Sequence, residues 1–367
     1  MGNSLFSPIK LRELELSNRI VVSPMCQYQS EDGNANDWHL MHYGSLSMGA
    51  AGLVLTEMTD VSEEGRISYQ CAGLYNDDNE AAWKHVVDFC KRFGVARIGV
   101  QLGHAGRKGS TLPPAKDGKP LTAADGAWQT VAPSAIPFAE SWHTPREATR
   151  ADMDKIKADF VAAVVRAERV GFDLVEMHAG HGYLMNQFLS PITNRRTDEY
   201  GGSLENRMRF VLEVFEAMRA AWPQNKPMGA RISATDWVEG EGFTVDEAVV
   251  LTMALKDRGI DYVDVSGGGL DPRQKPPFAP GYQVSMSEKV RAETGAVTSA
   301  VGLIDDARLA DDIIASGKAD LVKIGRGALY NPRWAWHAAQ ALGAETTYPG
   351  KYFAAQPKFR PWIFAKP

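Results

Sequence analysis

A short pattern recurs along this chain: a helical stretch ends at a glycine, an aspartate follows, and apolar residues then begin a strand. It occurs at 171–175 (Gly-Phe-Asp-Leu-Val) and 259–263 (Gly-Ile-Asp-Tyr-Val), with a variant at 317–322. Glycine commonly ends a helix because it readily adopts the left-handed backbone conformation. Repeated helix–glycine–strand units are typical of the βα units that build a parallel sheet.

The apolar segments predict eight strands in total. They are expected at 20–23, 53–56, 97–101, 174–177, 228–233, 262–266, 297–300 and 321–324. Helices are expected at 38–48, 81–93, 152–170, 204–222, 244–258, 305–316 and 332–342. Eight strands in this order favour a (β/α)₈ barrel over an open sheet. The first βα turn also lacks a Gly-x-Gly-x-x-Gly fingerprint, which argues against a dinucleotide-binding Rossmann fold.

Three segments fall outside the repeating units of this single predicted domain, residues 1–367. Residues 1–16 alternate apolar and polar side chains and predict an N-terminal hairpin that closes the barrel bottom. Residues 103–147 form a loop after strand three that is too long for an ordinary barrel connection, so a functional cover over the open face is expected. Residues 348–367 form a C-terminal tail without regular structure.

The composition of the 367 residues is that of an ordinary globular protein, with 44% hydrophobic and 23% charged residues. A net charge of −5 and the absence of basic runs give no reason to expect nucleic acid. No apolar stretch approaches the roughly 20 residues of a membrane helix. The three cysteines are widely spaced, which disfavours a disulfide framework and predicts a cytoplasmic protein.

The strand at 174–177 leads directly into His178, His181, Gly182 and Tyr183. Loops after the strands of a parallel barrel form its active face. Two imidazoles and a phenol there offer hydrogen bonds to a polar ligand atom and a proton for chemistry. Structural histidines and a metal site are the alternatives. A metal is disfavoured because the spacing differs from the i, i+4 pattern of zinc proteases, and the one nearby third ligand, Glu176, lies inside the strand and points elsewhere.

Polar residues and glycines also follow the other strands. Loops after strands seven and eight are the usual phosphate site of barrels, where backbone N–H groups and a guanidinium bind the anion. Together these groups predict a phosphorylated, planar, polar cofactor. The residues concerned are Ser23, Pro24, Met25, Cys26 and Tyr28 after strand one, Gln101 on strand three, Arg231 on strand five, and Val301, Gly302, Gly325 and Arg326 after strands seven and eight.

Several longer motifs resemble the old yellow enzymes, the flavin mononucleotide (FMN)-dependent ene-reductases. The resemblance is to the class with cysteine after Ser-Pro-Met, which includes xenobiotic reductases and bacterial NADPH dehydrogenases. The motifs are Ser-Pro-Met-Cys-x-Tyr at 23–28, His-Ala-Gly-Arg-Lys at 104–108, His-x-x-His-Gly-Tyr-Leu at 178–184, Asn-x-Arg-Thr-Asp-Glu-Tyr-Gly-Gly-Ser at 194–203 and Ile-Gly-Arg at 324–326.

The resemblance implies an NADPH-dependent reductase of activated alkenes with FMN as cofactor. In that family His178 and His181 bind the carbonyl oxygen of the substrate, and Tyr183 protonates the α-carbon. Cys26 contacts the flavin and tunes its potential, and Tyr28 lines the substrate site. The residues implied to hold FMN are Ser23, Pro24, Met25, Cys26, Met58, Gln101, Arg231, Val301, Gly302, Gly325 and Arg326. Two of these positions depart from the family: Met58 is larger than usual, and Val301 is smaller than the Trp of one branch.

The resemblance further implies a homodimer or homotetramer in which Arg360 reaches a neighbouring subunit's active site. Some alternatives stay open. Cys26 could be a small buried hydrophobe, Arg231 could pair with Asp236 or Glu239, and Arg107 with Lys108 could be a solvated pair. A flavin-free barrel lyase and a flavin-binding protein without physiological turnover are the competing functions.

Overall fold

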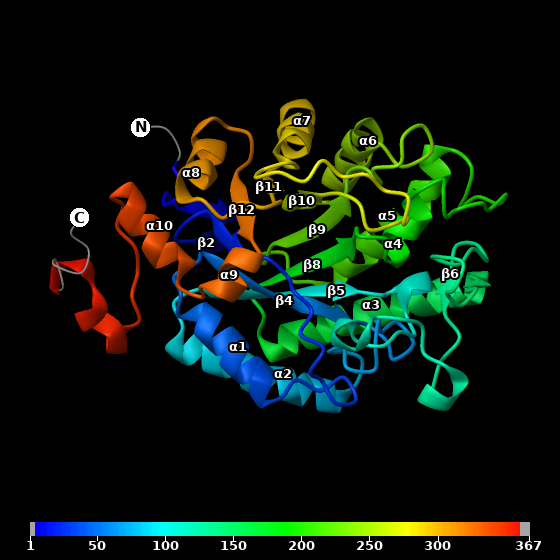
Figure 1. Cartoon of the computed structure of the whole chain (residues 1–367), viewed down its shortest axis with the longest axis horizontal. Helices are drawn as coiled ribbons and strands as arrows, with labels where there is room; N and C mark the ends of the chain where they lie inside the picture. The colour runs from blue at the N-terminus through cyan, green and yellow to red at the C-terminus, as the bar shows by residue number, and fades with distance from the viewer. Residues whose placement is uncertain (1–3, 360–367) are drawn as a thin grey trace.

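The computed structural model describes residues 4–359 and contains a closed barrel of eight parallel strands (Figure 1). Around the barrel the strands follow the chain order, as a (β/α)₈ barrel requires. They are β3 (Ile20–Val22), β4 (Leu53–Asp60), β5 (Arg97–Gly103), β8 (Leu174–Ala179), β9 (Met228–Ser233), β10 (Tyr262–Ser266), β11 (Thr298–Ala300) and β12 (Leu321–Ile324). The predicted fold class is therefore confirmed.

Helices surround the barrel and alternate with its strands. They are α1 (Asp37–Ser47), α2 (Asp77–Phe93), α3 (Arg150–Val170), α5 (Leu204–Ala221), α6 (Val245–Lys256), α7 (Val284–Thr294), α8 (Ala307–Ala315) and α10 (Trp334–Leu342). A capping box begins α6: the side chains of Thr244 and Glu247 each accept the other's backbone N–H. The sequence did not predict α7, nor the short helices α4 (Leu184–Leu189) and α9 (Arg326–Tyr330).

The N-terminal hairpin closes the bottom of the barrel, as predicted. Strands β1 (Ile9–Leu11) and β2 (Leu14–Leu16) pair antiparallel. Leu11 and Leu16 pack into a buried cluster with the lowest inward-facing side chains of the barrel, including Val21, Leu174 and Leu321. This layer is apolar, so the lower half of the barrel is a closed core.

One layer higher, the barrel interior is polar. Side chains alternate between the two faces of a strand, so the residues two positions after the apolar layer also point inward. These include Ser23, Gln101, Glu176, Arg231, Asp264 and Lys323, which bond to one another across the barrel. The change from an apolar to a polar layer marks the floor of a binding site.

The long segment after β5 packs against the loops at the carboxyl ends of the strands. It contains 3₁₀ turns and the two-residue strands β6 (Val131–Ala132) and β7 (Arg146–Glu147). Arg107 donates to the carbonyls of Ile136, Pro137 and Leu270, and Lys108 donates to two carbonyls of neighbouring loops. The interpretation of Arg107 and Lys108 as a solvated pair is therefore wrong: both side chains fasten this segment to the loops around the open end.

The C-terminal tail is less irregular than predicted, because residues 350–355 and 357–359 form 3₁₀ turns. Arg360, the predicted contact to a neighbouring subunit, lies outside the described residues. Within residues 4–359, no helix combines the length and the hydropathy that a membrane crossing requires.

Candidate active site

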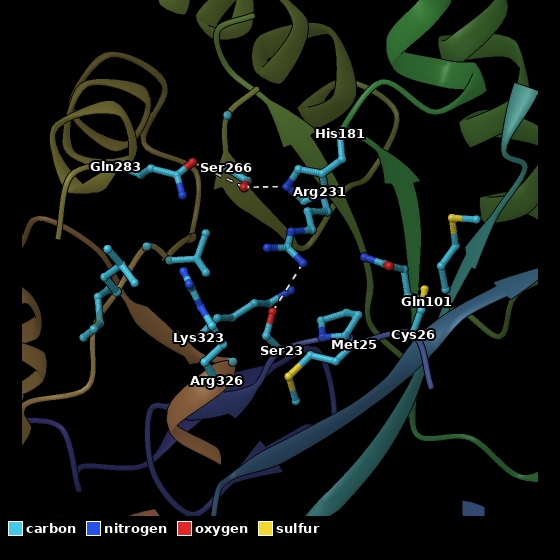
Figure 2. A pocket seen from close by; sticks show the side chains of 18 of the residues that line it. Ser23, Met25, Cys26, Gln101, His181, Arg231, Ser266, Gln283, Lys323 and Arg326 are labelled. Atoms are coloured by element: carbon cyan, nitrogen blue, oxygen red, sulfur yellow. Dashed lines mark hydrogen bonds between the residues drawn. The ribbon is translucent and has the colours of Figure 1, made fainter. Parts of the chain in front are cut away.

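A cavity of about 450 Å³ opens above the polar layer, at the carboxyl ends of the strands. This volume lies within the range of small-molecule sites. Figure 2 shows side chains from several strands and loops converging on it. Residues predicted to hold a cofactor all line this cavity: Ser23, Pro24, Met25, Cys26, Met58, Gln101, Arg231, Val301, Gly302, Gly325 and Arg326. His178, His181 and Tyr183 line it as well.

The two histidines form one hydrogen-bonded unit at the end of β8. Nε2 of His178 lies 3.3 Å from Nδ1 of His181, whose Nε2 lies 2.8 Å from Oγ of Ser266. The turn that allows this is tight: His181 has φ of 55° and Gly182 has φ of 74°. A Cβ at Gly182 would lie 2.3 Å from the carbonyl oxygen of Gly269. Only glycine therefore fits between the two loops.

Both imidazoles are neutral under physiological conditions. Burial lowers the pKa of His178 and His181 well below the ordinary value, and the nearby Arg231 guanidinium lowers it further. The backbone N–H of Gly180 donates to Nδ1 of His178 at 3.3 Å, so the single proton of His178 lies on Nε2. Nε2 of His178 faces His181 and Nε2 of His181 faces Ser266, so a bound oxygen atom would accept from these N–H groups in place of those partners and would meet no positive charge.

Tyr183 places its ring against His178, with 5.0 Å between the ring centroids and an interplanar angle of 73°. Nζ of Lys108 lies 5.0 Å from the centroid of the Tyr183 ring. Burial raises the pKa of Tyr183 well above the ordinary value, and nearby Cys26 raises it further. The phenol keeps its proton and can serve as an acid beside the two imidazoles.

Cys26 lines the cavity and is partly exposed, so it is not simply a buried hydrophobe. Burial raises the pKa of its thiol, and Glu57 raises it further. Cys26 is therefore present as the thiol rather than the nucleophilic thiolate. Tyr28, predicted to line the substrate site, is not among the residues that line the cavity. Like Cys26 and Tyr183, Tyr28 packs against a small apolar cluster that contains Met58.

Gln101 and Arg231 are held by charged partners in the floor. Nε2 of Gln101 donates to Oε1 of Glu176 at 2.8 Å, which leaves the amide oxygen of Gln101 as an acceptor. Arg231 does not pair with Asp236 or Glu239; its Nε lies 2.8 Å from Oδ2 of Asp264. Arg231 also donates from NH1 to Oγ of Ser23 at 3.3 Å. Both side chains are thus oriented before any ligand binds.

The far side of the cavity suits an anion. Arg326, at the start of α9, has no ion pair or side-chain hydrogen bond to any residue of 4–359. A Cβ at Gly325 would have no atom closer than 3.8 Å, so this wall leaves room for a ligand group. A guanidinium without an ion pair in residues 4–359, together with an oriented amide and a second guanidinium, fits FMN, which carries a phosphate and a planar hydrogen-bonding ring.

Sequence reasoning missed several residues of the cavity wall: Ser266, Gly267, Tyr282, Gln283, Leu303, Ile304, Asp305, Lys323 and Leu329. Ser266 is a polar residue at the end of a predicted strand, so it could have been found in the same way as Gln101. Lys323 is a charged residue inside an otherwise apolar strand, which is a detectable signal. Tyr282 and Gln283 precede the helix that the sequence did not predict. Among residues 4–359, no group of three His, Cys, Asp or Glu side chains could hold a metal ion.

Asp60, the last residue of β4, is a buried carboxyl close to this site. Neither of its oxygens has a hydrogen-bond partner in the described part of the chain. Burial raises its pKa well above the ordinary value, although Arg66 opposes the shift. The folded state is therefore most stable, as far as Asp60 is concerned, below the unfolded-state pKa of about 3.9. It loses this stability as pH rises through the higher pKa that Asp60 has in the folded protein.

We expect Asp60→Ala to be more stable than the natural chain near pH 8, by about 1–3 kcal/mol, because it removes an unpaired buried charge. The advantage should shrink as pH falls toward about 4, the ordinary pKa of an aspartate, because the raised pKa keeps the folded-state carboxyl protonated there. Urea unfolding at pH 8 and near pH 4 measures the difference. Asp88→Ala, on the exposed face of α2, is the matched control. A stability difference that does not depend on pH would contradict the assignment.

Comparison with known proteins agrees with this geometry. Residues 4–345 match the model of the NADH:flavin oxidoreductase / NADH oxidase family. The NADPH dehydrogenase of Geobacillus thermodenitrificans is 44% identical over 354 residues, covering 96% of this chain and 98% of the relative. The NADPH dehydrogenase of Clostridium acetobutylicum is 41% identical over 349 residues, covering 95% and 98%.

Solved structures show the same relationship. Morphinone reductase superposes with a TM-score of 0.78 at 30% identity, covering 95% of this chain and 92% of that chain. Its complex with tetrahydroNAD gives a TM-score of 0.76 at 31% identity, covering 94% and 92%. The family match excludes the flavin-free lyase considered from the sequence. The chain therefore belongs to the NADH:flavin oxidoreductase / NADH oxidase family and is an FMN-dependent oxidoreductase of the old yellow enzyme type.

Proposed function

We propose that the protein is an NADPH-dependent ene-reductase acting on α,β-unsaturated carbonyl and nitro compounds. One observation carries the proposal: two imidazoles and a phenol line the same cavity, with 5.1 Å between the imidazole centroids. Bound FMN would supply hydride transfer, from NADPH to the β-carbon of the alkene. The names of the NADPH dehydrogenases and the nicotinamide analogue in the morphinone reductase complex support the nicotinamide donor.

The residues of the chain would bind and protonate the substrate. His178 and His181 donate N–H groups to its carbonyl or nitro oxygen, which draws electrons from the double bond. Tyr183 donates its proton to the α-carbon. Cys26 would remain a thiol in contact with the ring of the cofactor, and Tyr28 would pack with Cys26 and Tyr183 against the apolar cluster that contains Met58.

Anaerobic reoxidation tests the function. FMN-loaded protein reduced with dithionite should regain its oxidised flavin spectrum when cyclohexenone is added, and NADPH should reduce it again. A flavin-binding protein without turnover would stay reduced in the presence of cyclohexenone. A steady-state panel of enones, maleimides and nitroalkenes with NADPH and NADH then defines the substrate class.

We propose in addition that the protein forms a homodimer or larger even oligomer. Large apolar side chains are exposed on α1 and α9, where Met41 is 53%, Leu329 48% and Tyr330 94% exposed. Leu329 also lines the cavity. Exposed large apolar side chains are common at protein interfaces. A second copy of the chain on this face would complete the cavity mouth.

Sedimentation velocity should therefore show an even oligomer. Deleting residues 358–367 is expected to raise the KM for enones several-fold without changing the FMN content, because the tail would belong to the neighbouring subunit's substrate site. An equal loss of FMN would instead indicate general damage to the fold. A monomer, or a truncated protein with unchanged kinetics, would contradict the shared site.

A further inference from the structure

A group of buried charges occupies the polar layer beneath the cavity. Nζ of Lys323 on β12 donates to Oε2 of Glu176 on β8 and, at 2.8 Å, to Oδ2 of Asp264 on β10. The same oxygen of Asp264 lies 2.8 Å from Nε of Arg231 on β9. Two cations and two carboxylates thus balance one another below the ligand site, and Figure 2 shows the two cations, Lys323 and Arg231.

Such a network is unusual in a barrel core, which is ordinarily filled by branched apolar side chains. The side chains of Lys323, Glu176 and Asp264 have no exposed surface at all. Removing ions from water costs several kcal/mol each, and apolar replacements of buried ion pairs are often neutral or stabilising. Stability therefore does not explain these charges, and an electrostatic function in the adjacent cavity does.

The structure connects Lys323 to the site in two ways. Lys323 lines the cavity together with Arg231, and only two of its three ammonium hydrogens have acceptors within residues 4–359. Its charge also reaches the substrate-binding end. After burial and Arg231, Lys323 is the next cause of the lowered pKa of His178.

A glycine on a neighbouring strand leaves space for a further member of the network. Tyr262 donates to Oε2 of Glu176 at 2.6 Å, and its ring lies where a side chain at residue 229 would be, because a Cβ at Gly229 would lie 2.2 Å from it. Glu176 also holds the amide of Gln101 at 2.8 Å. Lys323 and Glu176 are therefore positioned by neighbours on several strands, and they are coupled to a residue that faces the ligand.

We propose that Lys323 and Glu176 act as a pair of opposite charges that sets the reduction potential of FMN in the cavity above them. Reduction adds negative charge to the flavin, so Lys323 favours the reduced form and Glu176 opposes it. Loss of Lys323 leaves the floor with net charge −1, and loss of Glu176 leaves it at +1. The inference rests on the family cofactor and not on the proposed alkene substrate.

The test is an anaerobic reduction titration of FMN-loaded variants against a reference dye. Lys323→Met should shift the two-electron equilibrium at least tenfold toward oxidised flavin, which corresponds to about 30 mV. Glu176→Gln keeps an acceptor oxygen for Gln101 and should shift the equilibrium by a similar factor toward reduced flavin. The double variant Lys323→Met/Glu176→Gln restores neutrality and should lie within about threefold of the natural chain, if the two charges are of similar effect.

A structural role predicts a different result, because general loosening of the cavity would move both single variants in the same direction and weaken FMN binding in each. Lys256→Met, on the exposed end of α6, is the matched control for the lysine substitution. If the Lys323→Met protein cannot be obtained with FMN bound, the Glu176→Gln variant and the double variant decide between the electrostatic and the structural role. A double variant whose potential stays at the Glu176→Gln value, or single variants without opposite shifts, would overturn the proposal.

Discussion

Replacing Tyr183 with phenylalanine is expected to slow the reduction of enones by roughly 10²–10⁴-fold, the usual contribution of a positioned acid. The phenol faces the cavity beside His178, and burial raises its pKa well above the ordinary value, so it holds a transferable proton at neutral pH. Phenylalanine keeps the ring and its packing but cannot donate. Flavin reduction by NADPH requires no proton from Tyr183 and should stay nearly unchanged.

Stopped-flow measurement of the two half-reactions separates these effects. Tyr200→Phe is the matched control, because that hydroxyl bonds to Glu213 on the outer helix α5, away from the cavity. It should leave both half-reactions unaltered. Equal slowing of both half-reactions in Tyr183→Phe would show that Tyr183 supports the cavity structurally rather than as the acid.

The barrel was predictable because its strands are short, apolar and separated by glycine-terminated helices. The ranges predicted for β9 and β10 agree with the structure. The predicted end of strand β4 lies four residues before its end in the structure. A bulge between Leu55 and Met58 interrupts its alternation, and its later residues Glu57 and Asp60 are polar but buried. Helix α7 was missed because few apolar residues, chiefly Val284, Met286 and Val290, form its buried face.

The site was predictable to the extent that it follows strand ends. The carboxyl ends of parallel barrel strands converge, so His178, Gln101 and Arg231 could be placed together from their positions alone. The partners of these residues were not predictable. Arg231 pairs with Asp264 on the next strand rather than with the nearby Asp236, because the inward direction of a side chain, not its distance along the chain, decides what it meets.

The histidine pair yields the second large effect. His178→Ala or His181→Ala is expected to weaken binding of enones and para-substituted phenols by roughly 1–3 kcal/mol, or about 5- to 150-fold in Kd, because a buried oxygen loses an N–H donor. Titration of the ligand against the flavin absorbance measures the Kd. His178→Asn retains a donor and should recover part of the affinity. His85→Ala, on the exposed face of α2, should not change it.

The protonation state of the pair gives this prediction a second readout. Burial and Arg231 hold the pKa of both imidazoles well below the ordinary value, so neither titrates where a free histidine would. Affinity for a neutral enone should therefore be flat between about pH 6 and pH 8, a range that spans the ordinary histidine pKa of about 6.5. Tighter binding at the acid end would mean that a charged imidazolium binds the oxygen. Unchanged affinity in both alanine variants would remove the pair from substrate binding.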